Sequence, residues 1–149
     1  MKRLFILLLS FLLLFSVCRA ESARYFVVRW NSFAQHFNGV QLSEESAKEA
    51  GNTLAFFGDT WNLVLIRKDE KYISAAVYAD DFETLMSNCT TMGLVLVGDA
   101  ENFTTFLGAI AWQYLALKSG EKPIPSVYGA YIFNISKRNK GYTITFSEF

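Results

Sequence analysis

The 149-residue chain has little of three residue types that often reveal a protein's class, since it contains 2 Pro, 2 Cys and 1 His. With so few prolines and only 9 glycines, it fits neither the collagen-like nor the proline-rich class. Two cysteines cannot form the disulfide framework that holds small secreted scaffolds together. Hydrophobic residues make up 52% of the chain, which excludes intrinsic disorder because disordered chains have low hydrophobicity.

The short motifs that identify common active sites are also missing. The sequence has no G-x-S-x-G, C-x-x-C, H-E-x-x-H, G-x-x-x-x-G-K-[ST] or G-x-G-x-x-G segment. The single histidine, His36, falls at the flank of a predicted apolar helix face, which is typical of a residue at the core boundary. A pair of His36 with Cys89 is the one thiol enzyme that the chain could support. We therefore predict no metal site and no cofactor, and we favour a protein that is not an enzyme.

A secretory leader is predicted at the N-terminus. Lys2 and Arg3 give a short basic start, and residues 4–17 form an apolar run of 14 residues. Small residues, Cys18 and Ala20, then occupy the third-to-last and last positions before a cleavage site, which completes the pattern of a signal peptide. The run is shorter than the roughly 20 apolar residues that span a bilayer. We expect cleavage after Ala20 and export to the periplasm or the extracellular space.

The leader divides the chain into a signal peptide, residues 1–20, and one exported domain, residues 21–149. Two alternatives stay open: a lipoprotein anchored by a lipid on Cys18, and an uncleaved anchor. After cleavage, 11 basic and 14 acidic side chains remain, a net charge of −3. This charge argues against nucleic-acid binding and against adhesion to an anionic membrane, both of which need a basic surface. Cys89 is then the last cysteine, and we expect it to be buried and inert.

Apolar side chains at steps of three and four predict helices at residues 24–38, 82–97 and 100–118. Within the second, residues 93–97 could also form a buried strand, although we favour a helix. The third helix is apolar on both sides, so we expect a central core helix or one that offers Trp112 to a partner. We expect Gly39 to end the first helix, Asp80 and Asp81 to begin the second, and Asp99 to cap the third. A short helical turn is also expected at residues 44–50, with Ser43 as its N-cap and Gly51 as its end.

Short runs of β-branched and aromatic residues predict strands. Residues 53–57 form one run, residues 61–67 and 72–79 form a hairpin around a charged loop, and residues 131–136 and 142–149 form a second hairpin. Period-2 alternation places alternate residues on opposite faces of each strand. In the strand at residues 72–79, we expect Tyr72, Ser74, Ala76 and Tyr78 to share one face and Ile73, Ala75, Val77 and Ala79 to share the other.

These elements predict a single α+β domain. We expect an antiparallel sheet of four to five strands, packed by an N-terminal amphipathic helix and a central apolar helix. A fold of this kind supports many unrelated functions, so the fold itself does not identify one.

The abundance of tryptophan and tyrosine, together with the missing catalytic motifs, favours a non-enzymatic binding module that contacts a protein partner or a small ligand. The candidate contacts are Trp61, Tyr78 and Trp112. The alternative is a small exported hydrolase that uses carboxylates near Asp59 or Asp80.

Two further patterns have ordinary explanations. Lys137, Arg138 and Lys140 fit a solvated hairpin tip, although they also suit an anion contact. The N-x-[ST] triplets that begin at Asn88, Asn102 and Asn134 matter only if the source organism glycosylates exported proteins.

Overall fold

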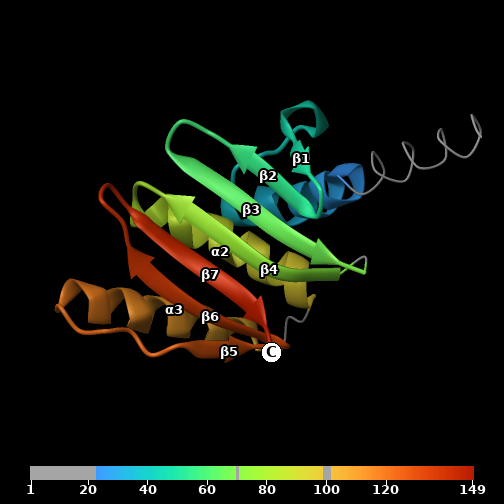
Figure 1. Ribbon diagram of the computed structural model, residues 1–149. Helices are drawn as coiled ribbons and strands as arrows, with labels where there is room; N and C mark the ends of the chain where they lie inside the picture. The colour runs from blue at the N-terminus through green and yellow to red at the C-terminus, as the bar shows by residue number, and fades with distance from the viewer. Residues whose placement is uncertain (1–22, 70, 99–101) are drawn as a thin grey trace, which may run out of the picture.

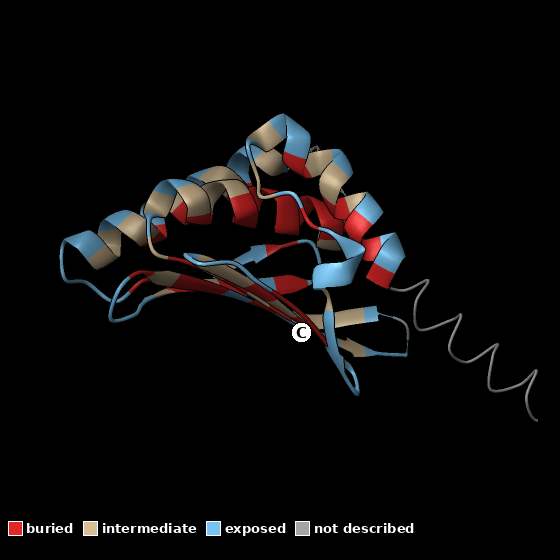
Figure 2. Cartoon of the chain, turned by 90° about the horizontal axis from the view of Figure 1, so that it is seen from above, coloured by how far each residue is buried: buried red, intermediate tan, exposed pale blue. Residues whose placement is uncertain are grey.

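The computed structural model describes residues 23–69, 71–98 and 102–149, which form two layers (Figure 1). One layer is a seven-stranded antiparallel sheet with the order β1-β2-β3-β4-β7-β6-β5. The other layer consists of helices that all cover the same face of the sheet (Figure 2). The elements are an N-terminal helix over residues 23–37, a 3₁₀ turn at Glu44–Ser46, β1 (Lys48–Ala50), β2 (Thr53–Phe57), β3 (Trp61–Lys68), β4 (Lys71–Ala79), α2 (Phe82–Val97), α3 (Phe103–Lys118), β5 (Ser126–Tyr128), β6 (Tyr131–Lys137) and β7 (Tyr142–Glu148).

The α+β class and both predicted hairpins are confirmed, but the expected number of four to five strands is wrong. The two additional strands are β1 and β5, which lie at opposite edges of the sheet and have three residues each. So short a segment shows no period-2 pattern, and its pairing depends on the neighbouring strand. The helical turn expected at residues 44–50 is also shorter than predicted. Ser43 caps it as expected, but it ends at Ser46 and the chain continues into β1.

Side-chain amides and an indole fix the segment that follows the N-terminal helix. Trp30 Nε1 donates a hydrogen bond to the Val40 carbonyl over 2.7 Å. The Asn31 amide both donates to the Leu42 carbonyl and accepts from its N–H, each over 2.8 Å. The helix ends through Asn38 in the left-handed conformation (φ 55°), whereas we expected Gly39 to take that position. Asn tolerates this conformation because its short polar side chain can bond locally.

Helix α2 lies across the middle of the sheet and is the most deeply buried helix of the described chain. The Asp81 carboxylate caps it by accepting the Thr84 N–H over 2.8 Å, as predicted. The preference for a helix at residues 93–97 is confirmed, and Gly98 (φ 69°) ends α2. The expected cap at Asp99, like the predicted leader, lies outside the described residues.

A β-bulge in the β3–β4 hairpin reverses one predicted orientation. The register pairs Ile66 with Ser74 but Arg67 with Tyr72, which leaves Ile73 as the extra residue. A bulge of this kind shifts the following side chain to the other face of the sheet. Tyr72 therefore points to the helix-covered face, where its ring packs edge-on against Phe26 with centroids 5.6 Å apart. The expectation that Tyr72 shares a face with Tyr78 is wrong for this reason.

The buried amide of Gln113 ties α3 to the edge of the sheet. Its Oε1 accepts the Ile135 N–H over 2.8 Å, and its Nε2 donates to Ser126 Oγ over 3.0 Å. The last pair between β5 and β6 is Ser126–Phe133, so the N–H of Ile135 lies just past the end of β5. The Gln113 side chain thus replaces the hydrogen bond that a longer β5 would have made.

We predict opposite effects for two glycine-to-alanine substitutions. A Cβ atom at Gly141 would collide with the Ala79 carbonyl and the Asp80 backbone, and backbone atoms cannot move aside cheaply, whereas a Cβ at Gly108 in α3 meets open space. Gly141→Ala should lower the free energy of unfolding by about 2 kcal/mol or more. Gly108→Ala should raise it by about 0.5–1 kcal/mol. Urea denaturation of both variants measures the difference, and equal stabilities would contradict the close approach at Gly141.

Candidate functional site

The outer face of α3 is the strongest candidate for a binding surface. It consists of the residues that helical spacing places opposite the buried side chains Phe106, Ile110 and Gln113. Of the two expectations for this helix, a central core helix is wrong, because α3 packs against β5, β6 and aromatic side chains of the neighbouring helices but leaves Trp112 and Leu115 exposed. The outer face carries Thr104, Thr105, Gly108, Ala111, Trp112 and Leu115.

This outer face is uncharged, and its C-terminal half, with Ala111, Trp112 and Leu115, is apolar. Trp112 is 75% exposed and Leu115 is 57% exposed, and the two side chains lie one turn apart. The one charged residue of α3 is Lys118 in its last turn, and its ammonium group lies 5.8 Å from the centre of the Tyr114 ring. A surface helix normally carries charged or polar side chains on its solvent side. The outer face of α3 is therefore suited to contact with another apolar surface.

The structure separates the three predicted contact residues. Trp61 pairs with Ala79 across β3 and β4, on the helix-covered face, while Tyr78 pairs with Asn62 on the opposite face. Trp61 is partly buried against the core, and a Cβ at Gly58 would collide with its indole ring. Trp112 lies on α3 and is the most exposed of the three. No single surface contains all three residues.

The face of the sheet that carries Tyr78 is not covered by any described helix (Figure 2), and we call it the open face. The strand register defines it as three rows of neighbouring side chains in which Lys48, on edge strand β1, is the one charged residue. The rows are Phe57, Asn62, Tyr78, Thr143 and Ser136; then Lys48, Ala55, Val64, Ala76, Thr145 and Asn134; then Ala50, Thr53, Ile66, Ser74, Ser147, Ile132 and Val127.

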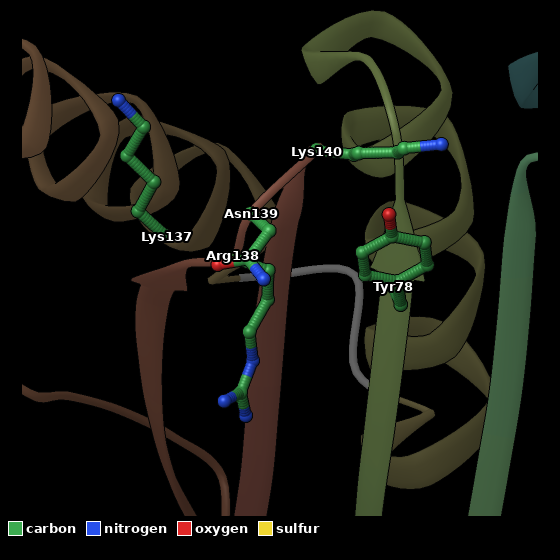
Figure 3. A pocket seen from close by; sticks show the side chains of 5 residues that line it. All are labelled: Tyr78, Lys137, Arg138, Asn139 and Lys140. Carbon is green, nitrogen blue, oxygen red and sulfur yellow. The ribbon is translucent and has the colours of Figure 1, made fainter.

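An open pocket of about 580 Å³ lies at one end of the open face (Figure 3). Its walls are Tyr78 and residues 137–140, the loop between β6 and β7. The Tyr78 hydroxyl donates a hydrogen bond to Asp80 Oδ1, and this bond raises the pKa of Tyr78 because the neutral phenol is the donor.

The predicted carboxylates do not form a catalytic pair at this pocket, since its lining residues include no acid. Asp80 bonds to Tyr78, and its N–H donates to the Thr60 carbonyl in the turn that contains Asp59. The hydrogen bond from the Thr84 N–H lowers the pKa of Asp81, as expected of a helix cap. Across the described ranges, no group of three or more His, Cys, Asp and Glu side chains is placed to hold a metal ion.

Cys89 and His36 also lie in different environments. Cys89 is completely buried in α2, and burial raises the pKa of its thiol, so the thiol stays neutral. His36 is exposed on the N-terminal helix and lies beside Gln35. A buried neutral thiol is a poor nucleophile.

The three N-x-[ST] triplets differ in accessibility. Asn88 is buried, and its Oδ1 accepts the Val40 N–H over 3.0 Å. Asn134 lies on β6 with a buried Oδ1. Asn102, which is exposed directly before α3, is the triplet asparagine that a modifying enzyme can reach most easily.

Sequence analysis missed two features of these surfaces. Leu115 extends the exposed surface of Trp112, and the spacing of three residues could have indicated this. The position of Arg138 near Tyr78 had no local signal, because it depends on the pairing of β7 with β4.

We predict that the pKa of Tyr78 falls toward 10 when Asp80 is replaced by Asn. In the folded protein, the pKa values of Tyr78, Tyr72 and Tyr131 are all raised above 10, for the last two mainly through burial. A raised pKa in the folded state means that folding favours the neutral phenols. Their contribution to the free energy of unfolding is therefore complete below about pH 10 and is lost as the pH rises through the folded pKa values. NMR of ring-labelled tyrosine measures the Tyr78 titration directly.

The matched control is Asp59→Asn, which removes a carboxylate that is not bonded to Tyr78. A Tyr78 pKa that is unchanged by Asp80→Asn would show that the hydrogen bond does not form in solution.

None of the helices in the described ranges has both the length and the apolar character needed to cross a membrane. The chain matches no family model, no curated protein and no solved structure.

Proposed function

We propose that this chain is an exported, non-enzymatic binding module that docks a protein partner on the outer face of α3. The observation that carries the proposal is the exposure of Trp112 and Leu115 on a helix whose outer face has no charged residue. Tryptophan is the residue type most enriched among interface residues that dominate binding energy.

The size of the exposed indole supports an anchoring role. Aromatic side chains bury about 150–250 Å² each, and apolar burial contributes roughly 25 cal/mol per Å². Because Trp112 exposes 75% of its surface, covering the exposed part contributes about 3–5 kcal/mol before the costs of association. Four residues before Trp112, one turn along the same face, Gly108 leaves open space above the helix backbone. A partner side chain can enter this space while Trp112 enters the partner.

The chemistry of the outer face indicates the kind of partner. Because Thr104, Thr105 and Ala111 flank the two exposed apolar side chains, an acidic or basic partner surface would find no opposite charge there. An apolar groove or the apolar face of an amphipathic helix fits this surface best.

Export is the second part of the proposal. It is supported by the basic start, the apolar run and the small residues of the predicted leader. The complete burial of Cys89 is compatible with an oxidising compartment, since a buried thiol is protected from pairing with other thiols.

We predict that Trp112→Ala weakens partner binding by about thirtyfold or more, because truncating a dominant interface residue costs at least about 2 kcal/mol. The test uses residues 21–149 with a photo-crosslinking amino acid in place of Leu115, applied to the envelope and medium of the source cells. A specific partner should cross-link at position 115 when residue 112 is Trp, and its recovery should fall when residue 112 is Ala.

The matched control is Tyr25, an exposed aromatic residue (65%) on the N-terminal helix. This helix covers the same face of the sheet as α3 but lies toward the opposite edge (Figure 1). Tyr25→Ala should leave partner recovery unchanged, and a cross-linker at position 25 should not capture the partner. If Trp112→Ala and Tyr25→Ala give the same recovery as the unchanged chain, α3 is not the docking surface.

A further inference from the structure

The open face of the sheet carries almost no charge, although no described helix covers it (Figure 2). Charged residues make up 19% of the chain, yet Lys48 on edge strand β1 is the one charged side chain in the three rows of this face. The cations Lys68, Lys71 and Arg138 lie at the hairpin tips, outside these rows. Depletion of charge at the centre distinguishes protein interfaces from ordinary surface. The middle of the open face therefore has the composition of an interface.

Apolar side chains of the open face are exposed to solvent on both sides of its middle. Phe57 and Ile66 lie on β2 and β3, and Ile132 and Val127 lie on β6 and β5, each between 40% and 61% exposed. The two strands between these groups, β4 and β7, present hydroxyl and small side chains. A molecule that covers this face must therefore place apolar groups on both sides of a polar centre.

One row of the open face is symmetric. Across β3, β4, β7 and β6, the register aligns Ile66, Ser74, Ser147 and Ile132 in that order. A second copy, rotated by 180° about an axis that runs parallel to the strands between β4 and β7, places its Ile132 over Ile66 and its Ser147 over Ser74. In a twofold interface, each residue that contacts a second residue is contacted by it in return. This row thus matches the same row of another copy.

The same axis also aligns the other two rows. It places Ala76 over Thr145 in the middle row and Asn62 over Ser136 in the row of Tyr78. The first contact joins small side chains, and the second joins groups that both donate and accept hydrogen bonds. No charged side chain lies in these central positions, so contact between two open faces has no charge to desolvate there.

The open face is large enough for a dimer. The axis between β4 and β7 overlaps six strands of each copy, from β2 to β5 in the order of the sheet. Strands about 4.8 Å apart and rows about 6.8 Å apart give a contact of about 30 by 20 Å, or about 600 Å² per copy. Two copies then bury about 1,200 Å², which is the lower limit of a stable interface.

We propose that the protein forms a twofold dimer in which two open faces pack against each other. The two sheets lie about 10 Å apart, with their strands aligned to within about 30°. The outer face of α3 lies on the far side of each copy (Figure 2) and points away from the dimer. The dimer therefore does not depend on the proposed docking of a protein partner, and it offers that partner two copies of the docking surface.

Sedimentation equilibrium of residues 21–149 at roughly 1–100 µM tests the dimer, for which we predict a Kd in the micromolar range. Thr145→Glu places a carboxylate at an exposed position in the centre of the open face. It should weaken dimerisation at least about tenfold, because each copy then buries an unpaired charge. The matched control is Thr105→Glu, the same change at an exposed threonine of α3, which should leave the Kd unchanged. Circular dichroism confirms that each variant folds.

Cross-linking locates the axis. Ile66→Cys and Ile132→Cys are prepared separately, mixed, and treated with a bis-maleimide that spans about 10 Å, the distance between packed sheets. The mixture should yield covalent dimers, whereas neither variant alone should, because the axis brings position 66 to position 132 and not to itself. Cys89 is buried and does not react.

The proposal is overturned if the protein remains a monomer at about 100 µM, since a micromolar dimer would form there. It is also overturned if Ile66→Cys cross-links to itself as efficiently as to Ile132→Cys. If Thr105→Glu disrupts the dimer and Thr145→Glu does not, the copies meet through α3, and a dimer of open faces is excluded.

Discussion

The fold depends on covering one face of the sheet with apolar side chains from the helices. Two groups of aromatic side chains cover this face, one toward each edge of the sheet. Phe26 of the N-terminal helix stacks on Phe56 and also contacts Trp30, and Phe106 of α3 packs between Tyr128, Phe133 and Phe146. The aliphatic side of α2 fills the space between them, with Leu85 and Met92 completely buried. Because apolar burial is the main favourable term in folding, this layer holds the helices on the central strands of the sheet.

The same layer decides which surfaces remain for function. Once the inner side of α3 is committed to the core, its uncharged outer face must meet solvent or another molecule. Once the helices occupy one face of the sheet, the opposite face is left with hydroxyl and amide groups in its middle and with exposed apolar side chains such as Phe57, Ile66 and Ile132. The outer face of α3 and the open face of the sheet therefore result from one packing arrangement, and they lie on opposite sides of the molecule (Figure 2).

Most long elements could be predicted from the sequence. The amphipathic N-terminal helix, α2, α3 and both hairpins follow from periodicity sustained over five or more residues. The short strands β1 and β5 could not be predicted, since three residues carry no period and the strands exist only through pairing with β2 and β6. The bulge at Ile73 was equally hidden, because a one-residue insertion in a ladder is visible only when both strands are aligned.

The candidate sites were predicted less well than the fold. Trp61, Tyr78 and Trp112 were grouped by residue type alone, and residue type does not tell which face of a strand or helix points outward. Trp61 and Tyr78 are on adjacent strands, yet they lie on opposite faces of the sheet. Trp112 was predicted to be buried or offered to a partner, and its exposure became known only from the packing of α3.

The sequence by itself determined the α+β class, the main helices and hairpins, and the cap at Asp81, because these depend on interactions between residues close in the chain. Tertiary structure decided the number of strands, the orientation of Tyr72, the exposed side of α3 and the approach of Arg138 to Tyr78. The first two depend on how neighbouring strands pair, which is visible only when both strands are aligned. The last two depend on the packing of elements that are far apart in the sequence, and such contacts leave no local pattern. The Thr143–Tyr78 pairing of β7 with β4 places Arg138 near Tyr78, although the two residues are sixty positions apart in the chain.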